Sequence, residues 1–197
     1  LYDHNNVPSK IGRGLFAERL LERFPNLPIE EEGRLNDRPP RENFIGRVYT
    51  YDRWRTMLES SPAPRDLVAF HARHKLLLLA HDPAYYYRMG PLVAEAGSVD
   101  FEKLLVRYEA LLMAALARPA PPRRHVNALR HIMGFLGDRL GGGGKAGIHG
   151  VIQEYRDGIV PRVGPLALLR FHLRRIDNDW VNGQIYLDPY PRELALR

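Results

Sequence analysis

The chain has 197 residues, which is enough for one good-sized domain, or for one domain and part of another, because domains usually hold about 100–150 residues. Charged residues make up 26% of the sequence and hydrophobic residues 45%, a balance that excludes an intrinsically disordered chain. The longest strongly apolar run, residues 110–117, is far shorter than the roughly 20 residues of a membrane-spanning helix, so we expect no segment to cross a membrane.

Cysteine is absent, and this excludes disulfides, cysteine nucleophiles and any thiolate-ligated zinc or iron–sulfur site built from this chain alone. The same absence fits a reducing compartment, and we expect a cytoplasmic protein. The sequence starts at Leu1 and continues with polar residues that do not form a secretion signal. We therefore expect the chain to be a piece of a longer protein.

Charge is unevenly distributed along the sequence. Residues 1–37 hold five Lys/Arg and seven Asp/Glu, a net charge of −2, whereas residues 38–197 hold 24 and 16, a net charge of +8. A basic body of this kind indicates a polyanionic partner. Arginine-rich composition of a GC-rich genome would give the same totals, and composition alone does not separate the two explanations.

The N-terminal part is predicted to be partly irregular. Residues 1–14 have a turn-forming composition, and residues 15–24 carry apolar side chains at helical spacing until Pro25 ends the pattern. The next segment contains three consecutive carboxylates, Glu30, Glu31 and Glu32, which indicate a solvated connector. We place a domain boundary here, between residues 1–36 and residues 37–197.

The remaining residues give a series of helical patterns. Asn36 or Asp37 can cap a long amphipathic helix that ends before residues 60–64, and Gly46 should loosen its backbone. A strongly apolar helix covers residues 64–82, two short helices are predicted within residues 85–97, and a helix covers residues 101–116. Further helices are predicted near residues 123–136, 148–155, 165–176 and, more weakly, 180–187, with residues 141–144 as a flexible joint.

No alternating strand pattern and no repeat of 20–50 residues is visible. The sequence therefore predicts an all-α fold, a compact bundle of about seven to nine helices.

Cationic side chains recur on several of these helices. Because residues three and four apart are neighbours on a helix, each group shares a face and can neutralise phosphates, while Tyr85, Tyr86, Tyr87, Trp54 or Trp180 can stack on bases. Nucleic-acid binding is one hypothesis, although no diagnostic motif accompanies it. The candidate residues are Arg73, His74, Lys75, Arg123, Arg124, His125, Asn127, Arg130, Arg156, Arg170 and Arg174.

Other classes of function remain open. His71 and His74 are spaced to reach one metal ion, with His125, His131 or His172 completing the site, but Arg73 and Lys75 would repel a cation. An acid–base enzyme around His71, His74 and His125 is the corresponding catalytic alternative, although no nucleophile–base spacing supports it. Histidines on a mostly apolar helix are more often hydrogen-bonded packing residues, and we expect this role for His71 and His81. A structural or dimerisation module is a third alternative, and the oligomeric state is left open.

Five segments resemble the YbgA-like domain of unknown function, over about residues 40–195. They are residues 67–81, Arg-His-Val-Asn at 124–127, Glu-Tyr-Arg at 154–156, Leu-Leu-Arg at 168–170 and Tyr-Leu-Asp-Pro at 186–189. Upstream, residues 7–17 and 29–37 resemble the end of a TudS-type desulfidase domain and its junction with the YbgA-like domain.

The resemblance implies a two-domain bacterial protein whose desulfidase half carries a cysteine-ligated iron–sulfur cluster and removes sulfur from thiouridine in transfer RNA. The YbgA-like half would help to hold the RNA. Because this chain has no cysteine, the resemblance transfers no catalytic residue and no cofactor to it. Residues 1–36 would be a remnant of the desulfidase domain, and only the RNA-binding role carries over to residues 37–197.

Overall fold

A computed structural model describes residues 14–194, apart from the side chains of Asp138, Arg139 and Arg192. The loop predicted for residues 1–13 lies outside the described residues. The helices of the described part are α1 Leu15–Arg23, α2 Arg38–Glu59, α3 Pro64–His81, α4 Pro83–Ala94, α5 Phe101–Leu116, α6 Pro122–Gly134, α7 Gly141–Arg156, α8 Val163–Leu173 and α9 Asp179–Asn182, with 3-10 turns at Glu32–Asn36, Gly137–Leu140 and Arg192–Leu194.

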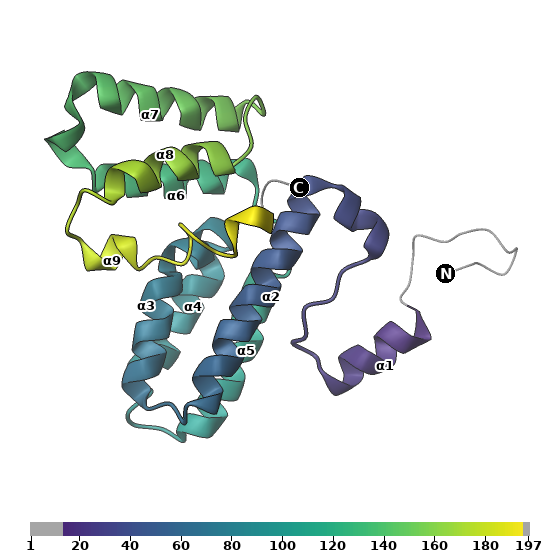
Figure 1. Cartoon of the computed structure of the whole chain (residues 1–197). Helices are drawn as coiled ribbons and strands as arrows, with labels where there is room; N and C mark the ends of the chain where they lie inside the picture. Colours follow the sequence, from purple (N-terminus) through teal and green to yellow (C-terminus); the bar gives the residue numbers. More distant parts are fainter. Residues whose placement is uncertain (1–13, 195–197) are drawn as a thin grey trace, which may run out of the picture.

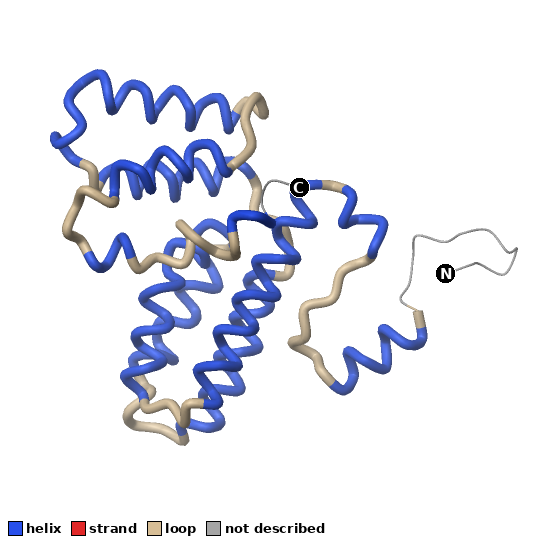
Figure 2. The backbone as a smooth tube through the Cα atoms, in the orientation of Figure 1, coloured by secondary structure: helices blue, strands red, loops and turns tan. Residues whose placement is uncertain are grey.

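The helices form two packed groups. Helices α2, α3, α4 and α5 make an up-and-down four-helix bundle, and α6, α7 and α8 lie across one end of it (Figure 1). Helix α9 and the segment that follows it run along the junction between the two groups. Between residues 14 and 194 the backbone contains helices, turns and loops but no strand (Figure 2), which confirms the predicted all-α fold.

Helix ends follow local side-chain chemistry where a cap is present. The Asp100 carboxylate accepts a hydrogen bond from the Lys103 N–H at the start of α5, and Asp82 does the same for the Ala84 N–H at the start of α4. Helix α3 begins at Pro64, where the missing N–H of proline costs nothing. The predicted bounds of α3 and α5 are therefore confirmed to within a residue.

An aromatic cluster organises the bundle core. Trp54 of α2 is fully buried, stacks on Tyr108 of α5 at 5.1 Å between ring centroids, and meets Phe70 of α3 edge-on at 5.2 Å. Its indole N–H donates to the Glu109 carboxylate at 2.9 Å, so burying the ring leaves no unpaired donor. Trp54 was considered for stacking on nucleic-acid bases, and its burial excludes that role.

Two helix predictions were wrong in detail. Residues 83–94 form the single helix α4, because Pro91 lies near its last turn and the buried Met89 and Leu92 hold that turn on the core. Residues 141–144 are not a joint but the first turn of α7. Helix α2 is continuous from Arg38 to Glu59, and the loosening of its backbone by Gly46 stays a prediction.

The C-terminal segment is helical only in the short α9, not across residues 180–187 as expected. In the segment after α9, hydrogen bonds to α3 take the place of the backbone hydrogen bonds of a helix. The side-chain amide of Gln184 accepts from the Leu76 N–H at 3.2 Å and donates to the Ala72 carbonyl at 2.9 Å, and the Ile185 N–H donates to the Arg73 carbonyl at 2.9 Å. These bonds dock the segment on α3, with the side chain of Tyr186 buried beneath it.

The segment between α1 and α2 was expected to be a solvated connector, and this was wrong for its first half. Asn26 donates to the Glu109 carboxylate of α5 at 3.0 Å, and the Glu30 side chain is only 7% exposed, where it pairs with Arg34 at 2.7 Å. The segment therefore packs against the bundle. Helix α1 itself has no buried residue, and Leu15 and Phe16 are each 80% exposed.

Candidate functional site

The cationic group on α3 is divided by the packing of the helix. Arg73 is exposed, and Lys75 is half-buried with its ammonium group 6.0 Å from the Tyr86 ring centroid and 5.7 Å from that of Trp180. Lys75 therefore anchors α9 and α4 to α3 through its contacts with two aromatic rings, and only Arg73 of this group lies open to solvent.

His74 is buried, not surface-exposed as the sequence predicted. It is 2% exposed, its Nδ1–H donates to the Phe70 carbonyl at 2.7 Å, and its ring stacks on Phe70 at 3.9 Å. Burial lowers the pKa of His74 to about 3, so its imidazole is neutral. The side chain of His74 therefore cannot contact an RNA on the surface of the folded chain.

The other two histidines of α3 are hydrogen-bonded within the fold, as we expected. His71 Nδ1 lies 3.0 Å from the Tyr108 hydroxyl, and the His81 Nδ1–H donates to the Arg118 carbonyl at 3.2 Å. Burial lowers the pKa of each to about 4. They pack in two different places, so α3 does not present a row of ligands.

Helix α6 presents most of its predicted face to solvent. Arg123, Asn127, Arg130 and His131 are exposed, and Arg130 reaches the Gln153 side chain of α7 at 3.4 Å. Arg124 differs, because it is partly buried and donates to the His81 carbonyl at the end of α3.

His125 faces inward and is 6% exposed. The prediction that it contacts RNA on the surface was therefore wrong, because residue 125 falls on the side of α6 that packs on the bundle.

The remaining candidates lie on α7 and α8. Arg156 is half-exposed and pairs with its neighbour Asp157 at 2.9 Å. Arg170 is only 11% exposed and binds the Asp188 carboxylate at 2.6 Å and the Leu187 carbonyl at 2.7 Å, so it fastens the C-terminal segment. Arg174 is exposed at the end of α8. Of these three, Arg174 is the most available to a partner.

The three helices α6, α7 and α8 with their connecting turns, residues 122–176, form what we call the basic layer. Its sequence holds ten Lys/Arg and three Asp/Glu, a net charge of +7, whereas the whole chain has +6. The excess positive charge of the protein therefore resides in this one layer of the fold.

A pocket of about 380 Å³ opens where the basic layer meets the bundle, and we call it the junction pocket. Its walls come from the first half of α2, the end of α3, the turn before α6, the turn between α7 and α8, and the C-terminal segment. The volume lies within the roughly 300–1,000 Å³ of small-molecule sites. The charged residues that line it are Arg38, Glu42, Arg47 and Arg162.

Arg162 is the central charge of the junction pocket. Its guanidinium pairs with the Glu42 carboxylate at 3.2 Å, and the two side chains are only 11% and 15% exposed. It also donates to His125 Nε2 and to the Tyr190 hydroxyl, each at 3.4 Å. Burial opposes its charge, but the neighbouring tyrosine hydroxyls and Glu42 outweigh burial and raise the pKa of Arg162.

The histidine beside Arg162 is held in one neutral form. His125 Nε2 accepts from Arg162, so Nδ1 carries the proton and donates to the Tyr186 hydroxyl at 3.0 Å. Burial, followed by the charge of Arg162, lowers the pKa of His125 to about 2. The ring of His81 lies 6.2 Å away between centroids, so two neutral imidazoles line the pocket and neither adds charge to it.

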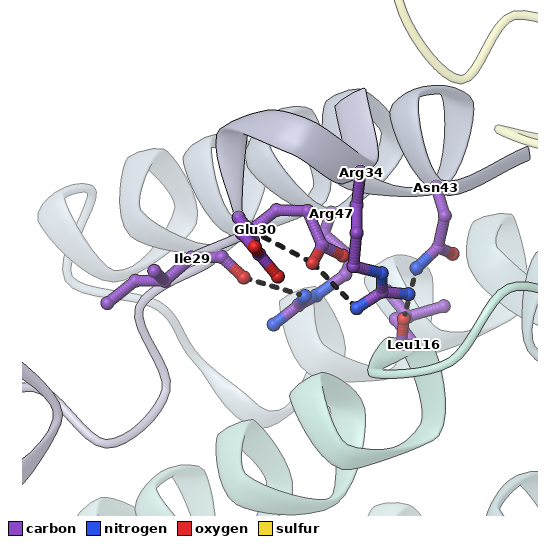
Figure 3. A network of polar contacts seen from close by, with 7 residues as sticks. Ile29, Glu30, Arg34, Asn43, Arg47 and Leu116 are labelled. Atoms are coloured by element: carbon purple, nitrogen blue, oxygen red, sulfur yellow. Dashed lines mark hydrogen bonds and ion pairs between the residues drawn. The ribbon is translucent and has the colours of Figure 1, made fainter. Parts of the chain in front are cut away.

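Helix α2 supplies two polar groups that are incompletely satisfied. The Asn43 amide donates to the Leu116 carbonyl at 3.2 Å and Arg47 Nη1 donates to the Ile29 carbonyl at 3.5 Å (Figure 3). Among the described residues, however, the buried Asn43 Oδ1 and Arg47 Nε have no hydrogen-bond partner. Burial also lowers the pKa of Arg47, partly offset by Glu30. Both residues line the junction pocket, and buried polar atoms without a hydrogen-bond partner are uncommon in folded proteins.

Across residues 14–194, no group of three or more His, Asp or Glu side chains is arranged to hold a metal ion. Within the same part of the chain, no helix is both long and apolar enough to cross a membrane. His71, His74 and His125 are not brought together in space as the alternative enzyme site requires.

The chain is similar to known proteins over most of its length. The family described as "Protein of unknown function (DUF1722)" matches residues 75–191. The chain belongs to this family. It is also 27% identical over 157 residues to the "Uncharacterized protein YbgA" of Escherichia coli (strain K12), which covers 79% of this chain and 93% of that protein. No solved structure matches. The resemblance to a YbgA-like domain of unknown function is thus confirmed.

Sequence reasoning missed most of the junction pocket. Glu42, His81 and Arg162 are far apart in the chain and share no motif, so only folding brings them together. The single local signal was Gly46, a glycine in the middle of a long helical pattern, which lines the same pocket.

Proposed function

We propose that this chain is the RNA-binding accessory part of a transfer RNA thiouridine desulfidase, and that it positions the RNA for a neighbouring iron–sulfur catalytic domain. The observation that carries the RNA-binding part is the basic layer, because a face that concentrates the net charge of a protein attracts a polyanion and gains affinity from counterion release. The link to desulfidation depends on the resemblance of residues 7–17 and 29–37 to a desulfidase domain.

The basic layer also offers groups that suit unpaired bases. Phe171 is 53% exposed at the end of α8, and the Arg175 guanidinium lies 5.1 Å from its ring centroid. An exposed aromatic ring next to a guanidinium can stack on a base, while Arg123, Arg130 and Arg174 contact phosphates. Phosphate contacts and one stacking platform would suffice to hold RNA without reading a sequence.

The chain's own role in this proposal is binding and orientation. It has no cysteine and therefore does not fit an iron–sulfur cluster, which must be held by another domain. Holding the RNA next to that domain raises the effective concentration of the thiolated base at the active site. No residue of this chain is assigned to the chemical step.

Replacing Arg123, Arg130 and Arg174 together by glutamine is expected to weaken transfer RNA binding strongly, because it removes three exposed phosphate contacts. At a salt concentration near 0.1 M, removing about three contacts should lower affinity by a factor on the order of 100. Filter binding or fluorescence anisotropy with unmodified transfer RNA measures the effect. Arg124 and Lys75 are poorer choices because both are engaged in packing.

The matched control replaces Arg55, Arg65 and Arg107 by glutamine, which changes charge by the same amount at exposed helical positions outside the basic layer. This variant should retain most of the transfer RNA affinity. Equal losses in both variants would show that net charge alone attracts the RNA. Failure of the unmodified chain to bind transfer RNA at low salt would refute the RNA-binding role.

A further inference from the structure

We propose that the junction pocket binds a nucleoside monophosphate, either as a free molecule or as one unstacked nucleotide of an RNA strand. The pocket is separate from the exposed cations of the basic layer, and nothing in the family description assigns a ligand to it. Three features of its walls define the chemistry of the occupant: charge, hydrogen-bonding groups and the absence of a side chain at Gly46.

The charge of the pocket selects an anion. Arg38, Arg47 and Arg162 carry three positive charges and Glu42 carries one negative charge, while His81 and His125 are neutral. An excess of positive charge attracts both the dianionic phosphate monoester of a free nucleotide and the monoanionic phosphodiester of an RNA nucleotide, and the guanidinium fork fits the oxygens of either. Arg47 Nε is the buried donor that has no acceptor among the described residues.

The rest of the wall selects a flat, hydrogen-bonding body attached to the phosphate. Asn43, which is 7% exposed, lines the pocket and has a carbonyl oxygen without a partner among the described residues; the oxygen is covered, and a rotation of the amide would bring it to an N–H of the ligand. Leu77, Leu116 and Ile159 supply apolar surface, and Tyr155 supplies an aromatic face. A nucleobase combines apolar faces with N–H groups at its edge, which is the combination that these residues would satisfy.

Gly46 indicates that open space is maintained in the pocket. A glycine inside a helix costs about 1 kcal/mol relative to alanine. The fold does not require it, because a Cβ at residue 46 would lie 4.0 Å from the Tyr190 ring, an ordinary contact. Gly46 and Tyr190 both line the pocket, so a side chain larger than that of alanine at residue 46 would extend into it.

Isothermal titration calorimetry of the whole chain provides the test, with uridine and adenosine monophosphates, the corresponding nucleosides, inorganic phosphate and a short single-stranded oligouridylate as probes. We expect nucleotide binding that weakens at least about tenfold when the phosphate is removed, since charge-assisted hydrogen bonds are lost. Gly46→Leu should reduce binding at least as much by filling the pocket. Gly150→Leu is the control and should not weaken binding. It makes the same change at an exposed position of α7, where nothing lies within 4 Å of the added Cβ.

The outcomes separate the two sources of the ligand. Binding of free monophosphates that is lost in Gly46→Leu supports a free nucleotide, whereas binding of the oligonucleotide alone, also lost in Gly46→Leu, supports an unstacked RNA nucleotide. Three results would overturn the proposal. They are the absence of binding for both the free monophosphates and the oligonucleotide, binding that Gly46→Leu does not weaken, and inorganic phosphate that binds as tightly as a nucleotide. If Gly46→Leu does not fold, Gly46→Ala, expected to be more stable than the natural chain, should still weaken binding.

The RNA-borne form of the ligand depends on the proposed RNA-binding function, and the free form does not. Replacing Arg123, Arg130 and Arg174 by glutamine should leave binding of free monophosphates unchanged, because these residues do not line the pocket. Transfer RNA binding without pocket binding would leave the proposed function standing and remove only this inference.

Discussion

Replacing Glu42 by alanine is expected to lower the free energy of unfolding by about 3–5 kcal/mol, because breaking a buried ion pair leaves the other charge uncompensated. Arg162 would then remain charged at 11% exposure, with its hydrogen bonds to His125 and the Tyr190 hydroxyl but no carboxylate partner. Urea unfolding followed by circular dichroism measures the change. This pair links the turn between α7 and α8 to α2, so its loss should also loosen the contact between that turn and α2.

Glu22→Ala is the matched control for this prediction. Glu22 also pairs with an arginine, Arg19, at 3.0 Å, but both side chains are more than half exposed. Exposed pairs contribute about 0–1 kcal/mol, so this variant should be nearly neutral. Replacing Glu42 and Arg162 together by leucine and methionine should recover part of the lost stability. A change below about 1 kcal/mol for Glu42→Ala would contradict the role of the pair.

Stability is expected to fall steeply as the pH decreases from about 6.5 to 5. Burial lowers the pKa of His71, His74, His81 and His125 to about 4, 3, 4 and 2, whereas an unfolded histidine has a pKa near 6.5. Below pH 6.5 the unfolded chain binds protons that the folded chain does not, so each histidine removes up to about 1.4 kcal/mol per pH unit. The stabilising contribution is therefore complete above pH 6.5.

Urea unfolding at a series of pH values tests this expectation with two paired variants. His74→Gln removes one buried imidazole and should flatten the pH dependence by up to about 1.4 kcal/mol per pH unit. His131→Gln makes the same change at an exposed position of α6 and should leave the slope as it is. A slope that is unchanged in His74→Gln would show that folding does not lower the pKa of this histidine.

The helices could largely be predicted because their signals are local. Asp100 caps α5, Pro64 begins α3, and apolar residues recur at helical spacing in both. Where a local signal competed with packing, prediction failed. Pro91 suggested a break in α4, but the buried Met89 and Leu92 hold that turn on the core; the glycines at 141–144 suggested a joint but form the first turn of α7. Gln184 shows the reverse case, since its bonds to α3 replace a helix that the sequence favoured.

Candidate residues were harder to predict because a helical spacing does not say which face meets the core. Arg123 and Arg130 are exposed on α6 as expected, but His125 on the same helix is buried. On α3, His74 is 2% exposed and its ring stacks on Phe70, so a histidine predicted on the surface is a core residue. The pair Glu42–Arg162 joins residues 120 positions apart, and no pattern within a single helix could indicate it.

The salt dependence of transfer RNA binding tests the RNA-binding role of the basic layer most directly. The logarithm of the binding constant should fall linearly with the logarithm of salt concentration, with a slope of about 0.7–0.9 per phosphate contact. Replacing Arg123, Arg130 and Arg174 by glutamine should reduce that slope by about 2–3, while the Arg55, Arg65 and Arg107 variant keeps it. Binding that does not vary with salt, or an identical slope in all three proteins, would contradict an RNA interface on the basic layer.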